Sequence, residues 1–186
     1  DFIKDQELLN AIAEEGDSFY IPTGDYTYWK GWWNKPAANT KQRLAEYIWK
    51  TNLPIKLDIK ADGFEYWTGI QTADPNMGFE NNLGGHFDKD EELFELTGKI
   101  VTPSMGTVYY PEQSEFEGGM LEIYTNGEDN PPEVVYAKSN RLIIFDAGKD
   151  PHRVTVVTKG QRLAIAINLW SQEPYSKQIG KFNIEG

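Results

Sequence analysis

Residues 162–170 read Arg-Leu-Ala-Ile-Ala-Ile-Asn-Leu-Trp, and this stretch decides the fold class. The run is apolar almost throughout, which is typical of a buried β-strand. Because side chains alternate across a strand, its two faces can be separated by position. One face carries Leu163, Ile165, Ile167 and Leu169, and the other carries Arg162, Ala164, Ala166, Asn168 and Trp170. The stretch predicts a central strand with one bulky face and one face of small side chains led by an arginine.

The arginine-led face has two interpretations. Small side chains such as Ala164 and Ala166 leave a cavity, and Arg162 supplies a planar cationic fork that can pair with a carboxylate. That combination suits a small dicarboxylate ligand. Alternatively, Arg162 reaches to water from the strand end while the alanines face a large aromatic side chain. Asn168 and Trp170 share this face and either line the same pocket or pack beneath the sheet.

Outward from this strand, the chain after about residue 55 is rich in short strands separated by Gly, Pro, Asn and Asp. Alternating patterns predict strands at 55–60, 64–67, 106–110, 120–124, 134–137, 142–145, 154–158 and 163–170. Asp62-Gly63 is a hairpin signal between the first two. Many short strands at this spacing predict a sandwich or a jelly roll, so the fold class is mainly β.

The N-terminal region has helical patterning instead. Residues 5–15 carry an apolar stripe and stop at Gly16, and a second helix is predicted from about Thr40 to Lys50. Between them, Trp29, Trp32 and Trp33 are expected to pack in the core rather than to form a substrate wall. Residues 89–98 are ambiguous and could begin a short helix.

The length of 186 residues favours one domain over 1–186. Within it we expect a helical N-terminal support (1–54), a jelly-roll core (55–170) and a C-terminal tail (171–186). The absence of an 18-residue apolar run and of a signal peptide leads us to expect a cytoplasmic protein that spans no membrane. The oligomeric state stays open.

Composition removes several function classes. The chain has no cysteine, which excludes disulfides, thiolate metal sites and cysteine nucleophiles. The formal net charge is −11, which argues against nucleic acid and anionic membranes as partners. Only two histidines are present, His86 and His152. Any chemistry that needs imidazole has those two candidates.

The sequence Gly84-Gly85-His86-Phe87-Asp88 places an imidazole and a carboxylate two residues apart. On a strand these two side chains would project to the same face. His152, the only other histidine, is the candidate third ligand. Two histidines and one carboxylate with open positions are the arrangement of non-haem Fe(II) oxygenases, while a zinc site or a plain structural role are the alternatives.

These residues belong to an ordered series of motifs. Together the series resembles the Fe(II)/2-oxoglutarate-dependent dioxygenase superfamily, most closely its prolyl-4-hydroxylase-like branch, over about residues 55–170. The matching pieces are Tyr66-Trp67-Thr68-Gly69, His86-Phe87-Asp88, Gly106–Tyr110, Glu117–Leu121, Arg141–Phe145, Pro151–Val154 and Arg162. The segment from Ile70 to Leu83 is longer than usual for the family, and we expect residues 71–83 to form a lid over the metal.

The resemblance implies a double-stranded β-helix, a jelly-roll or cupin-like core. It implies that His86, Asp88 and His152 are the catalytic residues and hold Fe(II). It implies that 2-oxoglutarate chelates the metal and pairs its far carboxylate with Arg162, helped by Tyr110, with Tyr66 as a further cosubstrate contact. Dioxygen is the second cosubstrate, and ascorbate is an additional candidate cofactor.

The implied activity is hydroxylation, because halogenating relatives lack the carboxylate that Asp88 supplies. The expected substrate is a prolyl residue in a peptide or protein. A free amino acid or another small molecule is the closest enzymatic alternative. A jelly-roll module that binds sugars without catalysis and a cupin-like metal enzyme that uses no 2-oxoglutarate are the alternatives of other kinds, and neither needs the triad together with Arg162.

Overall fold

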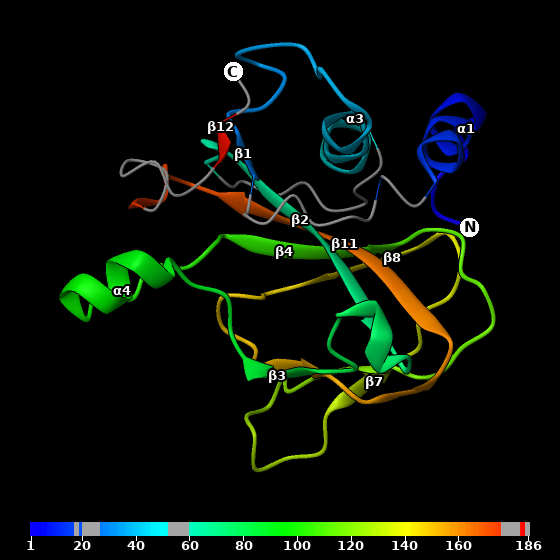
Figure 1. Ribbon diagram of the computed structural model, residues 1–186. Coiled ribbons are helices and arrows are strands. Elements are labelled where there is room, and N and C mark those ends of the chain that lie inside the picture. Colours follow the sequence, from blue (N-terminus) through cyan, green and yellow to red (C-terminus); the bar gives the residue numbers. More distant parts are fainter. Residues whose placement is uncertain (17–18, 20–26, 52–59, 176–182, 185–186) are drawn as a thin grey trace.

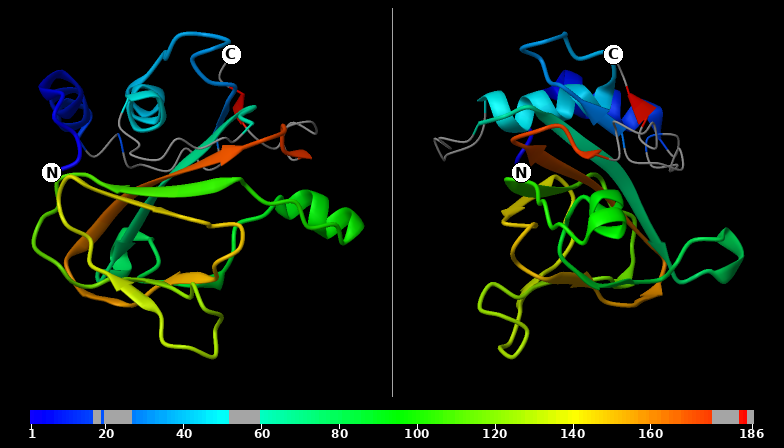
Figure 2. Two further views of the ribbon diagram at one scale, coloured as in Figure 1. Left: turned by 180° about the vertical axis from the view of Figure 1, so that it is seen from behind. Right: turned by 90° about the vertical axis from the view of Figure 1, so that its left-hand side faces the viewer.

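A computed structural model describes residues 1–16, 19, 27–51, 60–175 and 183–184. In these residues two β-sheets face each other, and helices cover the outer face of the larger sheet (Figures 1 and 2). The fold class is the predicted one, mainly β with N-terminal helices and a jelly-roll core. None of the described helices is long and apolar enough to cross a membrane.

The larger sheet has six strands in the described part of the chain, and β11 lies inside it. In spatial order they are β12 (Asn183–Ile184), β1 (Thr27–Trp29), β2 (Gly63–Thr72), β11 (Gln161–Trp170), β4 (Met105–Tyr110) and β8 (Arg141–Phe145). β11 is antiparallel to both of its neighbours and pairs with β2 over its whole length. The stretch that decided the fold class is therefore an interior strand, as its composition predicts.

The smaller sheet faces the side of β11 that carries Arg162, Ala164 and Ala166. Its strands, in spatial order, are β3 (Leu83–His86), β9 (His152–Val154), β6 (Leu121–Ile123) and β7 (Glu133–Val135), and a two-stranded ribbon of β5 (Glu117–Gly118) and β10 (Val157–Lys159) closes one side. A small apolar cluster formed by Leu121, Ile123 and Val154 packs against Val108 and Ile143 of the larger sheet.

The main core lies on the other face of β11, beneath the N-terminal helices. The helical elements are α1 (Gln6–Glu15), α3 (Thr40–Glu46), the π-helical turn η1 (Tyr47–Thr51), the 3-10 turn η2 (Pro75–Met77) and α4 (Glu91–Thr97). α1 begins where the Asp5 carboxylate accepts the backbone N–H groups of Glu7 and Leu8. It buries Leu8 and Ile12 against the sheet, where Ile165 and Ile167 of β11 are fully buried.

The tryptophan-rich segment packs as predicted, with one exception. The rings of Trp29 and Trp32 lie 5.9 and 5.5 Å from the ring of Phe64 on β2. Trp33 contacts the same ring at 5.6 Å, but its side chain stays 47% exposed. The aromatic cluster thus joins the N-terminal region to the sheet on the side away from the pocket.

Several element boundaries differ from the sequence prediction. The strand expected at 154–158 is divided into β9 and β10, because the Thr155 N–H and hydroxyl bond to Met120 and Val157 N–H bonds to Asn81 instead of continuing the ladder. The ambiguous segment forms α4, with Asp90 as its N-cap. β1 and β12 extend the larger sheet at one side, from regions expected to be helical support and tail. The strand predicted at 55–60 lies almost wholly outside the described residues.

Candidate active site

A cavity of about 540 Å³ opens between the two sheets. His86, Asp88 and His152 line it, and so does Arg162 at the other end of the same cavity wall. Between them the larger sheet contributes Gly69, which has no side chain, and Ala164 and Ala166, whose methyl groups are too small to fill the space. The small face of β11 thus forms the floor of a pocket, which is the first of the two interpretations that the sequence allowed.

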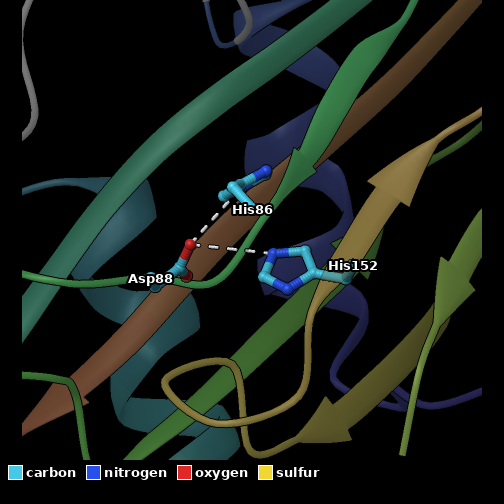
Figure 3. A group of neighbouring side chains, drawn as sticks. All are labelled: His86, Asp88 and His152. Carbon is cyan, nitrogen blue, oxygen red and sulfur yellow. Dashed lines mark ion pairs between the residues drawn. The ribbon is translucent and has the colours of Figure 1, made fainter. Parts of the chain in front are cut away.

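His86, Asp88 and His152 converge on one point in that pocket (Figure 3). Asp88 Oδ1 lies 3.4 Å from His86 Nε2 and 3.6 Å from His152 Nε2. Each residue offers a ligand atom within 4.8 Å of the others, a spacing that could hold a metal ion. The donor set of two imidazole nitrogens and one carboxylate oxygen fits iron or zinc.

Backbone carbonyls orient both imidazole rings. His86 Nδ1 lies 2.8 Å from the Gly84 carbonyl oxygen, and His152 Nδ1 lies 3.1 Å from the Asp150 carbonyl oxygen. A carbonyl only accepts, so in the neutral ring Nδ1 carries the hydrogen and the Nε2 lone pair faces Asp88. This is the tautomer that a metal ligand needs.

The prediction that His86 and Asp88 lie on the same strand is wrong for Asp88. β3 ends at His86, which pairs with His152 across the small sheet, so Asp88 lies beyond the strand. Its N–H leaves the ladder and donates to the Ala147 carbonyl oxygen at 2.7 Å. The carboxylate reaches the histidines through this turn, not through strand alternation.

The two histidines differ in their electrostatics. The hydrogen bond to Asp88 raises the pKa of His86 above its usual value, against the effect of burial. Burial lowers the pKa of His152 below its usual value, although Asp88 acts in the opposite direction. His152 therefore stays neutral at neutral pH, and a bound cation would take the place of the proton that the hydrogen bond to Asp88 favours on His86.

Arg162 is a buried cation whose polar partners are neutral. Its guanidinium donates to Gln71 Oε1 at 2.6 Å and to the Tyr110 hydroxyl at 3.0 Å, and only 3% of the residue is exposed. Arg162 Nε has no hydrogen-bond partner among the described residues. The interpretation of an arginine reaching to water is wrong. A buried charge without a counter-charge suits an anionic ligand.

Tyr66 does not fit the expected cosubstrate contact. It lies on the face of β2 that packs under the helices, where it is 2% exposed within the main core. Its hydroxyl accepts from Asn39 Nδ2 at 3.5 Å. Alternation along β2 turns Trp67 and Gln71 to the pocket instead. By contrast, Tyr110 lies on the pocket side and bonds directly to Arg162.

Three pocket residues on β2 were missed by the sequence analysis: Glu65, Trp67 and Gln71. The signal that could have found them is register. Glu65 lies opposite Asn168, Trp67 opposite Ala166 and Gln71 opposite Arg162, each beside a residue of the small face of β11. Glu65 is the most unusual, because burial raises its pKa to about 8.

The long segment before His86 lies beside the pocket. β2 continues to Thr72, η2 follows, and the chain returns as β3. Phe79, Glu80, Asn82 and Leu83 from this return line the cavity. The position is compatible with the expected lid, which stays a prediction.

The fold and the pocket together define a jelly-roll protein with a candidate two-histidine, one-carboxylate metal site. Residues 76–170 match the family model described as the 2OG-Fe(II) oxygenase superfamily, and the chain belongs to that family. Its members are named for their use of iron and 2-oxoglutarate. The match spans the candidate metal ligands and Arg162.

A solved structure shows the same fold at low identity, and two others are similar to a lesser degree. A Pseudomonas putida prolyl-4-hydroxylase superposes with a TM-score of 0.54 at 17% identity, over 90% of this chain and 82% of that one. A Phytophthora capsici prolyl 4-hydroxylase gives 0.46 at 13%, over 88% and 52% of the two chains. A 2OG-Fe(II) oxygenase-family protein from Burkholderia pseudomallei gives 0.44 at 12%, over 73% and 52%. The comparison with curated proteins found no match.

Proposed function

We propose that this chain is an Fe(II)- and 2-oxoglutarate-dependent hydroxylase in which His86, Asp88 and His152 bind the metal. One observation carries the proposal: the three ligand groups converge in the same pocket that contains a buried arginine with no ion-pair partner among the described residues. A metal site alone would be compatible with other chemistry. The arginine adds an anion site at the far end of the pocket, as a dicarboxylate bound to the metal requires.

The three protein ligands would leave the metal open positions for a bidentate cosubstrate and for dioxygen. When bound, iron with 2-oxoglutarate activates dioxygen so that a C–H bond of the substrate is hydroxylated. The chain's own residues position these groups. The Gly84 and Asp150 carbonyls hold the two imidazoles in the tautomer that can bind a cation.

At the other end, we propose that Arg162 and the Tyr110 hydroxyl bind the far carboxylate of 2-oxoglutarate. Within the described part of the chain, Arg162 Nε has no hydrogen-bond partner, and the two terminal nitrogens of the guanidinium donate to Gln71 and Tyr110. The floor of Gly69, Ala164 and Ala166 leaves space for the carbon chain between the metal and the guanidinium. Burial of Arg162 excludes water, which strengthens pairing with a carboxylate.

We further propose that the substrate is a prolyl residue in a peptide or protein. This part rests on the fold likeness to the Pseudomonas putida prolyl-4-hydroxylase. A free amino acid or another small molecule is the second candidate, because the cavity of about 540 Å³ is of the size that holds a small ligand. A sugar-binding module is disfavoured, since it has no need of a buried arginine opposite a metal site.

An anaerobic titration tests the cosubstrate assignment. Fe(II) with 2-oxoglutarate should give the weak visible charge-transfer band of the chelate in the wild-type protein. Arg162→Ala should raise the 2-oxoglutarate concentration needed for half of the band roughly thirtyfold, because hydrogen bonds to charged groups contribute about 2 kcal/mol. The Fe(II) requirement should stay unchanged, because Arg162 does not contact the triad.

Arg141→Ala is the matched control. Arg141 also lies in the larger sheet, but it donates to the Tyr136 carbonyl oxygen on the surface. Absence of the band in wild-type protein would contradict the cosubstrate assignment. Equal effects of the two arginine variants would contradict the role of Arg162. Succinate formation with proline-containing peptides, compared with free proline and other amino acids, then separates the two substrate classes.

A further inference from the structure

The two oxygens of the Asp88 carboxylate have different neighbours. Oδ1 faces the Nε2 atoms of His86 and His152, at 3.4 and 3.6 Å. Oδ2 points to the larger sheet and accepts from Asn168 Nδ2 at 2.7 Å. The carboxylate is therefore held at one oxygen by the protein and presents the other to the candidate metal position.

Asn168 is itself held between its neighbours on β2 and β4. It is 1% exposed on β11 and lies opposite Glu65 of β2. Glu65 accepts from Trp170 Nε1 at 2.9 Å and from the Asn168 amide. On the other side, Gly106 leaves room for the amide, because a Cβ there would lie 3.0 Å from Asn168 Oδ1.

The chemistry of the partners sets the direction of the Asn168 amide. Its NH₂ group has two hydrogens, and the two groups that accept from it are the carboxyl groups of Asp88 and Glu65. A reversed amide would turn its oxygen to the Asp88 carboxylate, which only accepts. The carboxyl groups of Asp88 and Glu65 are thus joined through one amide.

We propose that Asn168 is a positioning residue that restricts Asp88 to one metal-facing oxygen. The proposal rests on the proposed metal site at His86, Asp88 and His152. With Oδ2 held by Asn168, Asp88 binds a cation through Oδ1 alone. A carboxylate free to rotate could bind through both oxygens and occupy a coordination position that the cosubstrates need.

Co(II) binding to the purified full chain, without 2-oxoglutarate, tests the proposal. Asn168→Leu keeps the branched shape of the side chain, although leucine is larger, and removes both hydrogen bonds. We expect Co(II) to bind 10- to 100-fold more weakly, the usual loss on removing a partner that orients a metal ligand, measured by calorimetry. We also expect the visible spectrum of bound Co(II) to change, because the spectrum reports the number and geometry of the ligands.

Tyr109→Phe is the matched control. It removes one partly buried hydrogen bond, to Asn140, from the opposite face of the same sheet. It should lose stability without any change in Co(II) affinity or spectrum. Asn168→Ala, which extends the alanines of β11, is the second variant in case the leucine is not tolerated.

A folded Asn168 variant that binds Co(II) within twofold of wild type, with the same spectrum, overturns the proposal. The outcome is separable from the proposed function through His152→Ala measured in parallel. Co(II) binding that His152→Ala abolishes and Asn168→Leu leaves unchanged overturns only the positioning role. Wild-type protein that binds no Co(II) overturns the metal site and, with it, the role of Asn168.

Discussion

Glu65 is a carboxyl group enclosed by the larger sheet. It is 7% exposed and accepts hydrogen bonds from Trp170 and Asn168. Burial raises its pKa to about 8 from an ordinary 4.5, Asp88 adds to the rise, and the two hydrogen bonds only partly oppose it. At neutral pH this side chain therefore holds its proton.

The raised pKa of Glu65 predicts a pH-dependent stability. The contribution of the protonated carboxyl is complete below the unfolded pKa of about 4.5 and is lost as pH rises through about 8. Glu65→Gln cannot titrate. Its free energy of unfolding should therefore improve relative to wild type between pH 5 and pH 9, by on the order of 4 kcal/mol. Urea unfolding of metal-free protein at both pH values measures the difference.

The exposed Glu112→Gln controls for the loss of one carboxylate from an acidic chain. If both variants shift equally with pH, burial of Glu65 is not the cause. A Glu65→Gln protein that loses stability relative to wild type at pH 9 would contradict the predicted direction.

Among single residues, site residues of a rare type could be predicted from the sequence. The face of a strand on which a given side chain lies could not. His86 and His152 could be identified because the chain has two histidines. Tyr66 was assigned to the pocket from its motif, yet it lies one position out of phase with Trp67, and a shift of one residue turns a side chain to the other face. Glu65 became visible only when its pairing with Asn168 was known.

Among the elements, β11 was the most predictable and the strand after His152 the least. The alternation of 163–170 defines both faces of β11 from sequence because one face is bulky and the other small. The segment 154–158 has the composition of one strand. It is interrupted because Gly119 N–H bonds to Val156 and Val157 N–H to Asn81, and such long-range partners leave no local pattern.

A substitution in the Gly118-Gly119 turn between β5 and β6 should change both the stability of the protein and its affinity for 2-oxoglutarate. Gly119 has a φ of +62°, and a Cβ there would lie 2.9 Å from both Arg162 Cδ and Val157 Cγ2. Gly119→Ala should therefore cost about 2 kcal/mol of stability and displace Arg162. Chemical unfolding and the 2-oxoglutarate titration measure the two consequences.

Gly127→Ala is a matched control for the backbone effect. Gly127 has a φ of +84°, and a Cβ there would meet no atom within 4 Å. Both variants carry the cost of a side chain at positive φ. Only Gly119→Ala should lose affinity for 2-oxoglutarate. Equal losses of affinity would show that contact with Arg162 is not what Gly119 provides.

In the whole molecule, the main core and the pocket lie on opposite faces of one sheet. The N-terminal helices α1 and α3 lie over one face of the larger sheet (Figure 1), the face that carries Ile165 and Ile167. On the other face a small apolar cluster joins the two sheets beside the pocket. The packing of N-terminal helices on a β core could be predicted from the sequence, because helical and strand patterns occupy separate parts of the chain. The edge pairing of β1 with β12 could not, because strands of two or three residues carry no periodicity.

The triad joins distant parts of the chain, so metal binding should stabilise the whole fold. His86 and Asp88 flank the end of β3, and His152 comes from β9, more than sixty residues later (Figure 3). A ligand that binds only the folded state at a hundred times its Kd adds about 2.7 kcal/mol. For a domain of this size, that is a rise in Tm of roughly 5–10 °C.

Anaerobic thermal unfolding with saturating Co(II) or Mn(II) measures this rise against metal-free protein. His152→Ala should lose most of it, because two ligands remain. The net charge of −11 offers a competing explanation, since divalent cations also bind acidic surfaces without a defined site. That explanation predicts equal stabilisation of wild type and His152→Ala, and it predicts that Mg²⁺ acts as strongly as Co(II). A site built from two imidazoles and one carboxylate should instead prefer Co(II), because nitrogen ligands suit transition metals better than Mg²⁺.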